Sequence, residues 1–256
     1  MIHLRKQKEI ELMKISGLVT GSILHELIEF IKPGISTMDI NDYVEKRILG
    51  EGMYPTFKGY NGFPAGACVS VNDEIVHGIP SEQRILTEGD IVSVDIGATY
   101  EGYISDAART YPVGEISKEA KNLIDVCENS FFAGLKCCTE SNYLSDIGNA
   151  VQEVAEKAGY SVVRDFVGHG VGTNLHEDPQ IPNYGKPGRG PKLNKGMALA
   201  IEPMINIGSY EAKVQLNNWT AVTIDGMLSA HYENTVVITD GKPEVITLDE
   251  RDKRGE

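Results

Sequence analysis

Residues 91–110 read IVSVDIGATYEGYISDAART, and two apolar runs in this stretch predict a pair of β-strands. The first run covers Ile91–Ala98 and the second Tyr103–Tyr111, with a glycine-containing connection between them. Asp95 interrupts the first run, and Asp106 follows in the second. Antiparallel neighbours could hold both carboxylates side by side. An isolated buried carboxylate is costly, so each needs a cation, a basic partner or solvent beside it.

Further acidic residues favour a metal over an ion pair. Arg109 is the simplest partner for Asp106, but Glu202 in MALAIEPMI and Glu233 in LSAHYENTVVI also interrupt strand-like apolar runs. Four carboxylates that converge in one core would repel each other unless divalent cations lay among them. His169 in the glycine-flanked FVGHGVG would add a nitrogen ligand, although a lone histidine is more often structural.

The type of ligand indicates hydrolytic chemistry. An oxygen-rich set with one imidazole and no thiolate suits Mn, Fe, Co or Zn, and ligand type does not choose among these metals. Two such ions about 3.5–4 Å apart can share a bridging water, lower its pKa and polarise a carbonyl group. The sequence therefore predicts a metal-dependent hydrolase.

The remaining periodicity predicts helices and strands in two similar series. Helical spacing covers residues 8–32, and a capping box at Ser36 and Asp39 begins a second helix that runs to the glycines at 50 and 52. The order restarts near residue 117, with helices expected at 119–137 and 145–157. Further strands are expected at 67–71, 161–167, 197–205, 219–224 and 228–239.

An internal displacement of 107 residues supports a duplication. Several positions recur at this displacement: Asp39-Ile40, Val44, Gly52 and Leu86-x-x-Gly89 become Asp146-Ile147, Val151, Gly159 and Leu193-x-x-Gly196. The same displacement carries Asp95 onto Glu202. Two α/β units would each offer one acid to a site between them.

Composition and charge exclude several other classes. With 256 residues, 41% of them hydrophobic, the chain is long enough for one large domain or two small ones. A net charge of -13 argues against nucleic acid as the main partner. The charged start, MIHLRKQKEIELMK, and the lack of a long apolar stretch argue against export and a membrane. Four cysteines without a C-x-x-C pair fit reduced thiols in the cytoplasm.

The motifs, in their order, resemble the type I methionine aminopeptidases, in their short bacterial form, of the pita-bread metallopeptidase family. The resemblance covers nearly the whole chain and is carried by six segments: NDEIVHGIP with His77, VSVDIG with Asp95, YISDAART with Asp106, GHGVGTNLHEDP with His169 and His176, AIEPM with Glu202, and SAHYENT with Glu233. Each motif has moderate specificity, whereas the ordered set is highly specific.

This resemblance implies an α/β (α+β) pita-bread fold. Two pseudo-symmetric halves would share a central antiparallel sheet backed by helices, with a dinuclear metal site between them. Residues 1–256 would form a single catalytic domain with an internal repeat at approximately 1–113 and 114–256. The implied activity is removal of the N-terminal methionine from nascent chains, deformylated if the source is bacterial, that have a small second residue.

The resemblance also implies a role for each site residue. Asp95 would chelate one metal ion, Asp106 and Glu233 would bridge both, and His169 and Glu202 would complete the other. Glu202 would also accept the proton of the attacking water. His176 would stabilise the oxyanion and His77 would contact the substrate, although either histidine could instead be a supporting residue near the site. The methionine side chain would lie among Tyr60, Phe63, Cys68 and Trp219.

Three departures from the family pattern leave the ligands intact. Asn61 and Asn234 stand where histidine is common, and Leu175 where an aromatic residue is common. Asn61 and Leu175 would affect the shape of the pocket or the rate, and Asn234 would affect the support of the ligands.

Alternative functions remain at this stage. X-Pro aminopeptidases and dipeptidases share the ligands but usually carry an extra N-terminal domain, and a non-catalytic peptide-binding module of this fold would lack ligands. We expect a monomer. Transient contact with the ribosome stays open.

Overall fold

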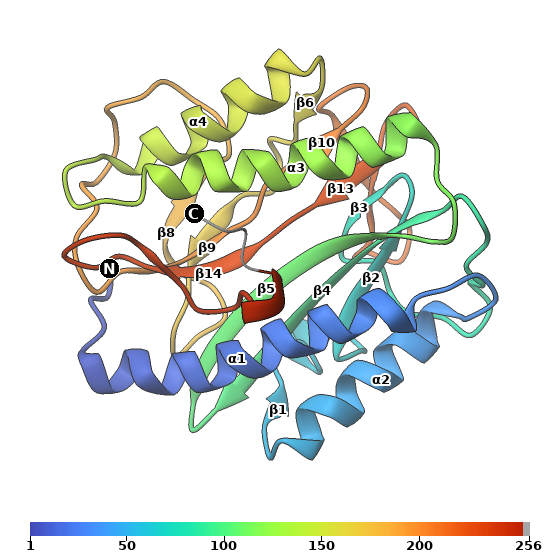
Figure 1. Cartoon of the computed structure of the whole chain (residues 1–256), viewed down its shortest axis with the longest axis horizontal. Coiled ribbons are helices and arrows are strands. Elements are labelled where there is room, and N and C mark those ends of the chain that lie inside the picture. Colours follow the sequence, from blue (N-terminus) through green and yellow to red (C-terminus); the bar gives the residue numbers. More distant parts are fainter. Residues whose placement is uncertain (253–256) are drawn as a thin grey trace.

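The computed structural model describes residues 1–252 and has the mixed α/β architecture expected from the sequence (Figure 1). Helices α1 (Gln7–Phe30) and α2 (Thr37–Gly50) form one pair, and α3 (Lys118–Lys136) and α4 (Leu144–Lys157) form another. In Figure 1 the two pairs lie below and above the strands of the centre. All four helices lie within a few residues of their predicted limits.

The first half carries a four-stranded antiparallel sheet with order β1-β4-β2, in which β5 pairs with β4. Its strands are β1 (Tyr54–Pro55), β2 (Ala67–Val71), β4 (Ile91–Tyr100) and β5 (Tyr103–Pro112). The register places Asp95 opposite Ala108 and Gly97 opposite Asp106. Because side chains alternate along a strand, Asp95 and Asp106 project from the same face. The predicted pairing of the two acid-bearing strands is confirmed.

The second half contains a five-stranded sheet with order β15-β14-β9-β7-β8. Two three-stranded sheets, β13-β10-β6 and β11-β12-β3, complete the fold. The bounds are β3 (Glu74–Val76), β6 (Ser161–Val162), β7 (Gly168–Gly170), β8 (Glu177–Ile181), β9 (Ala198–Ile201), β10 (Met204–Asn206), β11 (Ala212–Val214), β12 (Ala221–Thr223), β13 (Ser229–His231), β14 (Asn234–Val237) and β15 (Glu244–Val245).

The predictions of single long strands at 197–205 and 228–239 were wrong. Each is two strands that separate at an acid: β9 and β10 flank Glu202, and β13 and β14 flank Glu233. Pro203 has no N–H to continue a ladder, which explains the first break. At the second, the Glu233 N–H donates to the Ala108 carbonyl at 2.9 Å, so the chain changes partner to β5 of the first half. The strands predicted at 161–167 and 219–224 are likewise shorter, at 161–162 and 221–223.

The displacement of 107 residues extends to the bounds and pairings of the elements. It carries α2 onto α4 and β1 onto β6 without any change in length. The pairing of Tyr54 with Thr99 becomes that of Ser161 with Asn206. The isolated bridge from residue 36 to 85 becomes the bridge from 143 to 192. The two halves are therefore pseudo-symmetric, while the proposed boundary near residue 113 stays a prediction.

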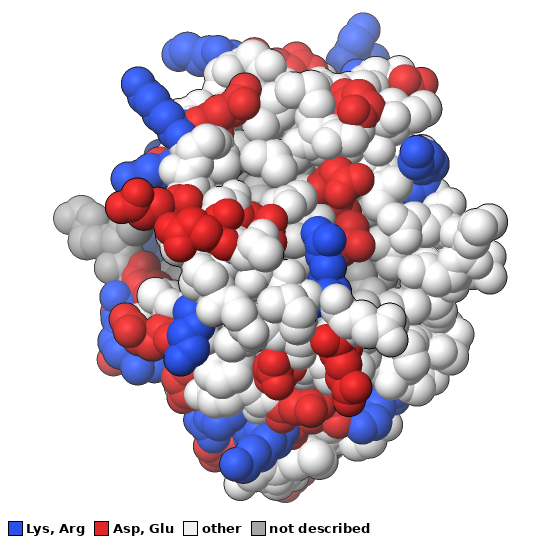
Figure 2. Space-filling model, turned by 90° about the vertical axis from the view of Figure 1, so that its right-hand side faces the viewer, with Lys and Arg blue, Asp and Glu red and all other residues white. Residues whose placement is uncertain are grey.

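The surface is charged and the interior apolar. Each half has its own apolar cluster between its helices and strands, and a third cluster lies where the halves meet. On the face in Figure 2, acidic side chains gather across the middle and basic ones lie scattered between them. Within residues 1–252, no helix is both long and apolar enough to span a bilayer.

Close packing of α4 gives a test of the fold. A Cβ at Gly148 would overlap the Pro182 carbonyl, whereas a Cβ at Gly50, the last residue of α2, has nothing within 4 Å. We expect Gly148→Ala to lower the free energy of unfolding by about 1–3 kcal/mol, because overpacking forces the backbone apart. Gly50→Ala is the matched control and should be neutral or slightly stabilising. Urea unfolding checks both, and equal effects would contradict the packing described.

Candidate metal centre and active site

One cavity of about 130 Å³ brings the predicted site residues together. It lies where strands of the two halves meet. Its lining comprises Phe57, Tyr60, Asn61, Phe63, Cys68, His77, Asp95, Asp106, His169, Leu175, His176, Glu202, Trp219 and Glu233. Every residue assigned a ligand, catalytic or substrate-contact role from the sequence is in this set, together with Phe57, which the sequence analysis did not single out.

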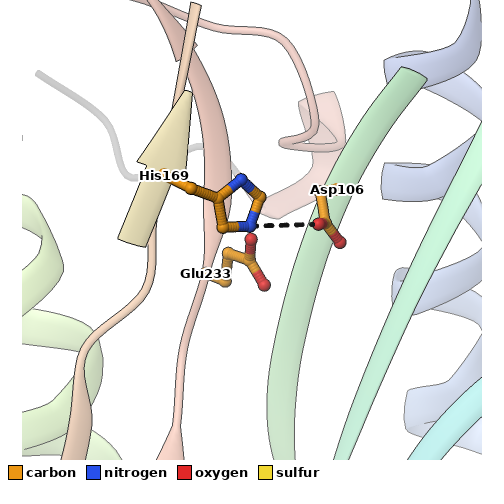
Figure 3. Close-up of side chains that lie close together, drawn as sticks. All are labelled: Asp106, His169 and Glu233. Atoms are coloured by element: carbon orange, nitrogen blue, oxygen red, sulfur yellow. Dashed lines mark ion pairs between the residues drawn. The ribbon is translucent and has the colours of Figure 1, made fainter. Parts of the chain in front are cut away.

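A group of three potential ligands stands at the base of this cavity. Figure 3 shows His169 of β7, Asp106 of β5 and Glu233, which directly precedes β14, pointing toward a common point. One ligand atom from each of the three lies within 4.8 Å of the other two. The distance from His169 Nε2 to Asp106 Oδ2 is 3.7 Å. All three side chains are buried.

Glu202 and Asp95 extend this group. Glu202, at the end of β9, places Oε1 at 3.4 Å from His169 Nε2. Burial, followed by the charge of Asp106, raises the pKa of Glu202 well above its ordinary value. Burial and then the charges of Asp106 and Glu202 do the same for Asp95. Burial also raises the pKa of Asp106, to about 7. The carboxyls thus repel each other strongly when all are ionised.

The hydrogen-bond donors near these carboxyl groups do not balance the negative charge that the groups would carry when ionised. Within residues 1–252, Asp95 Oδ1, Asp106 Oδ1 and Glu233 Oε1 are buried and have no hydrogen-bond partner. Arg109, the alternative partner for Asp106, instead donates to the Glu233 carbonyl at 2.5 Å and to Asn234 Oδ1 at 2.7 Å. Buried carboxylate oxygens without donors fit a bound cation. The residues therefore suit a divalent metal.

His169 has the protonation state that a ligand needs. Its Nδ1 lies 2.9 Å from the Gly170 carbonyl, which assigns the proton to Nδ1 and leaves the Nε2 lone pair directed at the carboxyls. Burial lowers the pKa of His169 to about 4. The imidazole is therefore neutral near pH 7.

Two more histidines border the cavity. Tyr60 Oη lies 2.8 Å from His176 Nδ1, and the rings of His176 and His169 are 4.4 Å apart. His77 adopts a left-handed backbone conformation with φ 59°, which side-chain-bearing residues rarely adopt. Its ring meets that of Phe166 edge-on at 5.5 Å. Burial lowers the pKa of His77 to about 4, so this ring is also neutral.

Phe63, Trp219 and Cys68 form an apolar wall of the same cavity. The Phe63 and Trp219 rings meet edge-on with centroids 5.1 Å apart. Cys68 of β2 pairs with Asp95 of β4, so the thiol lies on the same face as the carboxylate. Burial, followed by the charge of Asp95, raises the pKa of Cys68 well above its ordinary value. The thiol is neutral and adds a soft surface.

The three departures from the family pattern occupy different positions. Asn61 is exposed and has φ 49°, a conformation that asparagine tolerates better than most residues. Leu175 is buried against the apolar wall. Asn234 is fully buried, and its Oδ1 accepts from Arg109 and from Thr247 Oγ1 at 3.0 Å. Asn234 therefore connects the backbone beside Glu233 to Arg109 and Thr247, and it is not among the residues that line the cavity.

His231 was not singled out by the sequence analysis. Its side chain is 2% exposed, and Nε2 lies 3.9 Å from carboxylate oxygens of both Glu202 and Glu233. The motif SAHYENT could have indicated it, because His231 stands two residues before Glu233 and residues two apart on a strand share a face. Burial lowers its pKa to about 3, so the ring is neutral.

Comparison with known proteins gives a consistent result. The model of metallopeptidase family M24 matches residues 11–240. A methionine aminopeptidase of Clostridium acetobutylicum is 53% identical over 97% of this chain and 99% of its own. Methionine aminopeptidase 1 of Bacillus subtilis is 49% identical over 96% and 99%.

A solved structure agrees with these relatives. The crystal structure of a methionine aminopeptidase from Thermotoga maritima superposes with a TM-score of 0.96 at 44% identity, covering 97% of this chain and all of that chain. The pita-bread fold expected from the sequence is thereby confirmed. The match over most of the chain and the identity to full-length relatives show that this chain belongs to metallopeptidase family M24.

Proposed function

We propose that this chain is an aminopeptidase that removes the N-terminal methionine from peptides with a small second residue. The observation that carries the proposal is the buried group of Asp106, His169 and Glu233 in a cavity that aromatic side chains and a thiol also line. Family membership in M24 and the methionine aminopeptidases among its relatives support the same activity.

The five predicted ligands would hold two divalent ions, of Co, Mn, Fe or Zn. Asp95 would bind one ion, His169 and Glu202 the other, with Asp106 and Glu233 shared. The unpartnered oxygens of Asp95, Asp106 and Glu233 and the Nε2 lone pair of His169 support this assignment. When bound, such ions supply polarisation of the scissile carbonyl and a lowered pKa of water.

The side chains around the ligands would carry the proton and orient the substrate. Glu202, whose Oε1 lies 3.4 Å from His169 Nε2, would accept a proton from water and return it to the leaving amine. His176, held by Tyr60, would donate toward the developing oxyanion. His77, beside Trp219 at the mouth, would contact the chain beyond the scissile bond.

The apolar wall would select the first side chain. Phe63 and Trp219 present aromatic rings, Tyr60 borders the opening, and Cys68 presents a neutral thiol. A thioether gains from contact with aromatic edges and with other soft groups. Methionine therefore suits this pocket better than a charged or a β-branched side chain.

The partners follow from the chemistry proposed. A free α-amino group is needed, so the substrates would be nascent chains, deformylated if the source is bacterial, in the cytoplasm. Transient ribosome contact and a monomeric state belong to the same proposal. Nucleic acid is not proposed as the main partner, because a net charge of -13 disfavours binding to phosphates.

An assay on two tripeptides tests the activity. With added divalent metal we expect release of methionine from Met-Ala-Ser and little or no release of alanine from Ala-Pro-Ala, because the apolar pocket selects the first side chain. Glu202→Gln should lower kcat by roughly 10²–10⁴-fold through loss of the proton acceptor. Folded, metal-loaded protein that cleaves only Ala-Pro-Ala would indicate the X-Pro activity instead.

The pocket wall gives a second prediction. Trp219→Ala removes the partner of Phe63 and should raise KM for Met-Ala-Ser about tenfold, with a smaller effect on kcat, because the lost contact is made in both ground and transition states. Leu216→Ala is the matched control, since this nearby side chain is fully exposed. Steady-state kinetics of both variants decide. An unchanged KM for Trp219→Ala would remove tryptophan from the pocket.

The raised pKa values predict an unusual pH dependence of stability in metal-free protein. The Asp106 carboxyl keeps its proton to about pH 7 when folded but loses it near its ordinary pKa when unfolded. Its contribution to stability is thus complete below the unfolded pKa and is lost as pH rises through about 7. Asp106→Asn keeps a neutral group at all pH values and avoids this loss.

With chelator present, we therefore expect Asp106→Asn to match the original chain near pH 4 and to exceed its unfolding free energy at pH 8, by on the order of 2–4 kcal/mol. The low pKa of His169 acts in both proteins and cancels in the comparison. Excess divalent metal should reverse the order at pH 8, because only the original chain keeps all ligands. Urea titrations at both pH values measure this, and a constant difference would contradict it.

A further inference from the structure

The segment before α1 belongs to the first half by sequence but contacts the second half. The Arg5 N–H donates to the Gly196 carbonyl at 2.7 Å. Ile2 packs against the apolar cluster that contains α3 and α4. A Cβ at Gly196, whose φ is +87°, would lie 2.8 Å from the Arg5 carbonyl oxygen. The backbone around residue 5 is therefore closely fitted to the second half.

The Arg5 side chain ends in a buried ion pair with Glu177. The guanidinium Nη2 contacts Glu177 Oε2, and each side chain is only 6% exposed. Gly172 lies against the same guanidinium, and a Cβ there would overlap it. Since a buried charge without its partner is costly, removal of Arg5 would force the Glu177 carboxylate to move or to become neutral.

Glu177 also braces the loop that precedes it. Its second oxygen, Oε1, accepts from the Thr173 and Asn174 N–H groups at 3.0 and 3.1 Å. Burial raises the pKa of Glu177, but the Asn174 N–H and the charge of Arg5 outweigh burial and hold it below its ordinary value. The ionised carboxylate thus connects the loop of residues 172–177 to Arg5.

His176 is the polar residue that this loop presents to the cavity, beside Leu175. Its neighbours along the chain are Leu175, buried in the apolar wall, and Glu177. Tyr60 reaches its Nδ1 from the other side of the cavity. The hydrogen bond to Tyr60 therefore holds the imidazole ring at Nδ1, while the position of the His176 backbone depends on Glu177. Arg5 itself is not one of the residues that line the cavity.

We propose that Arg5 is a positioning residue for the reaction, acting through Glu177 to hold His176 where the oxyanion develops. The catalytic part of this inference rests on the proposed function. The structural part, that Arg5 orders the loop of residues 172–177, does not. Arg5 does not line the cavity, so its effect on the reaction passes through the loop that carries His176.

A mutant cycle tests the catalytic part. Arg5→Met keeps the aliphatic stem and removes the charge. It should lower kcat for Met-Ala-Ser by roughly 10- to 100-fold with KM and the calorimetric metal affinity little changed, because His176 acts in the transition state. In a His176→Ala background the same substitution should cost less than twofold. Arg5→Lys, which keeps a cation, should recover part of the loss.

Lys14→Met is the matched control. Lys14 of α1 pairs with Glu244 at 2.9 Å and also crosses to the second half, but it does not contact the loop of residues 172–177. It should leave kcat within twofold of the original chain. An equal loss in Lys14→Met, or an undiminished effect of Arg5→Met in the His176→Ala background, would overturn the proposal.

Amide hydrogen exchange tests the structural part without activity. The Thr173 and Asn174 amides should exchange at least tenfold faster in Arg5→Met and unchanged in Lys14→Met. If Arg5→Met does not fold, Glu177→Gln, which keeps the shape of the carboxylate, takes its place in both experiments. Unchanged exchange at these amides in a folded variant would refute the brace even if the original chain released no methionine.

Discussion

Mutual repulsion of carboxyl groups in one buried cavity is the constraint on which the rest of the structure depends. Asp95, Asp106, Glu202 and Glu233 would not all stay ionised without a cation, because burial disfavours each charge and each charge disfavours the next. Rigid strands must therefore hold them. Two come from paired strands of the first half, and two stand where strands of the second half break, at Pro203 and at the hydrogen bond from Glu233 to Ala108.

The duplication explains only part of this arrangement. The displacement of 107 residues carries Asp95 onto Glu202, but it carries Asp106 onto Lys213, an exposed residue of β11. In the second half the β11–β12 hairpin occupies that place in the sequence, and the acid partner, Glu233, follows it. The same hairpin region brings Trp219 to Phe63 and His77 of the first half. Departure from exact symmetry thus supplies both Glu233 and Trp219 to the lining of the cavity.

Local patterns predicted the elements, whereas contacts between the halves were not predictable from them. The helices and β2 followed from periodicity, capping residues and apolar runs, which are properties of neighbouring residues. The acids were found because a charge in an apolar strand needs an explanation. The strand breaks at Glu202 and Glu233 depend on partners far along the chain, and so does the turn of Arg109 away from Asp106. His231 was missed because its one signal, the spacing of two residues from Glu233, is weak for a residue type that is often structural when buried.

The site also depends on the two halves being docked. The first half supplies Asp95 and Asp106 and the second half His169, Glu202 and Glu233, so neither half holds all of the predicted ligands. A metal that binds only the docked arrangement stabilises it by linkage. Arg5 strengthens the same docking from outside the cavity, since it precedes the first helix and is buried against Glu177 of the second half. The chain therefore secures the loop of His176 with a segment 172 residues away in sequence, and the geometry of the cavity depends on both halves of the domain.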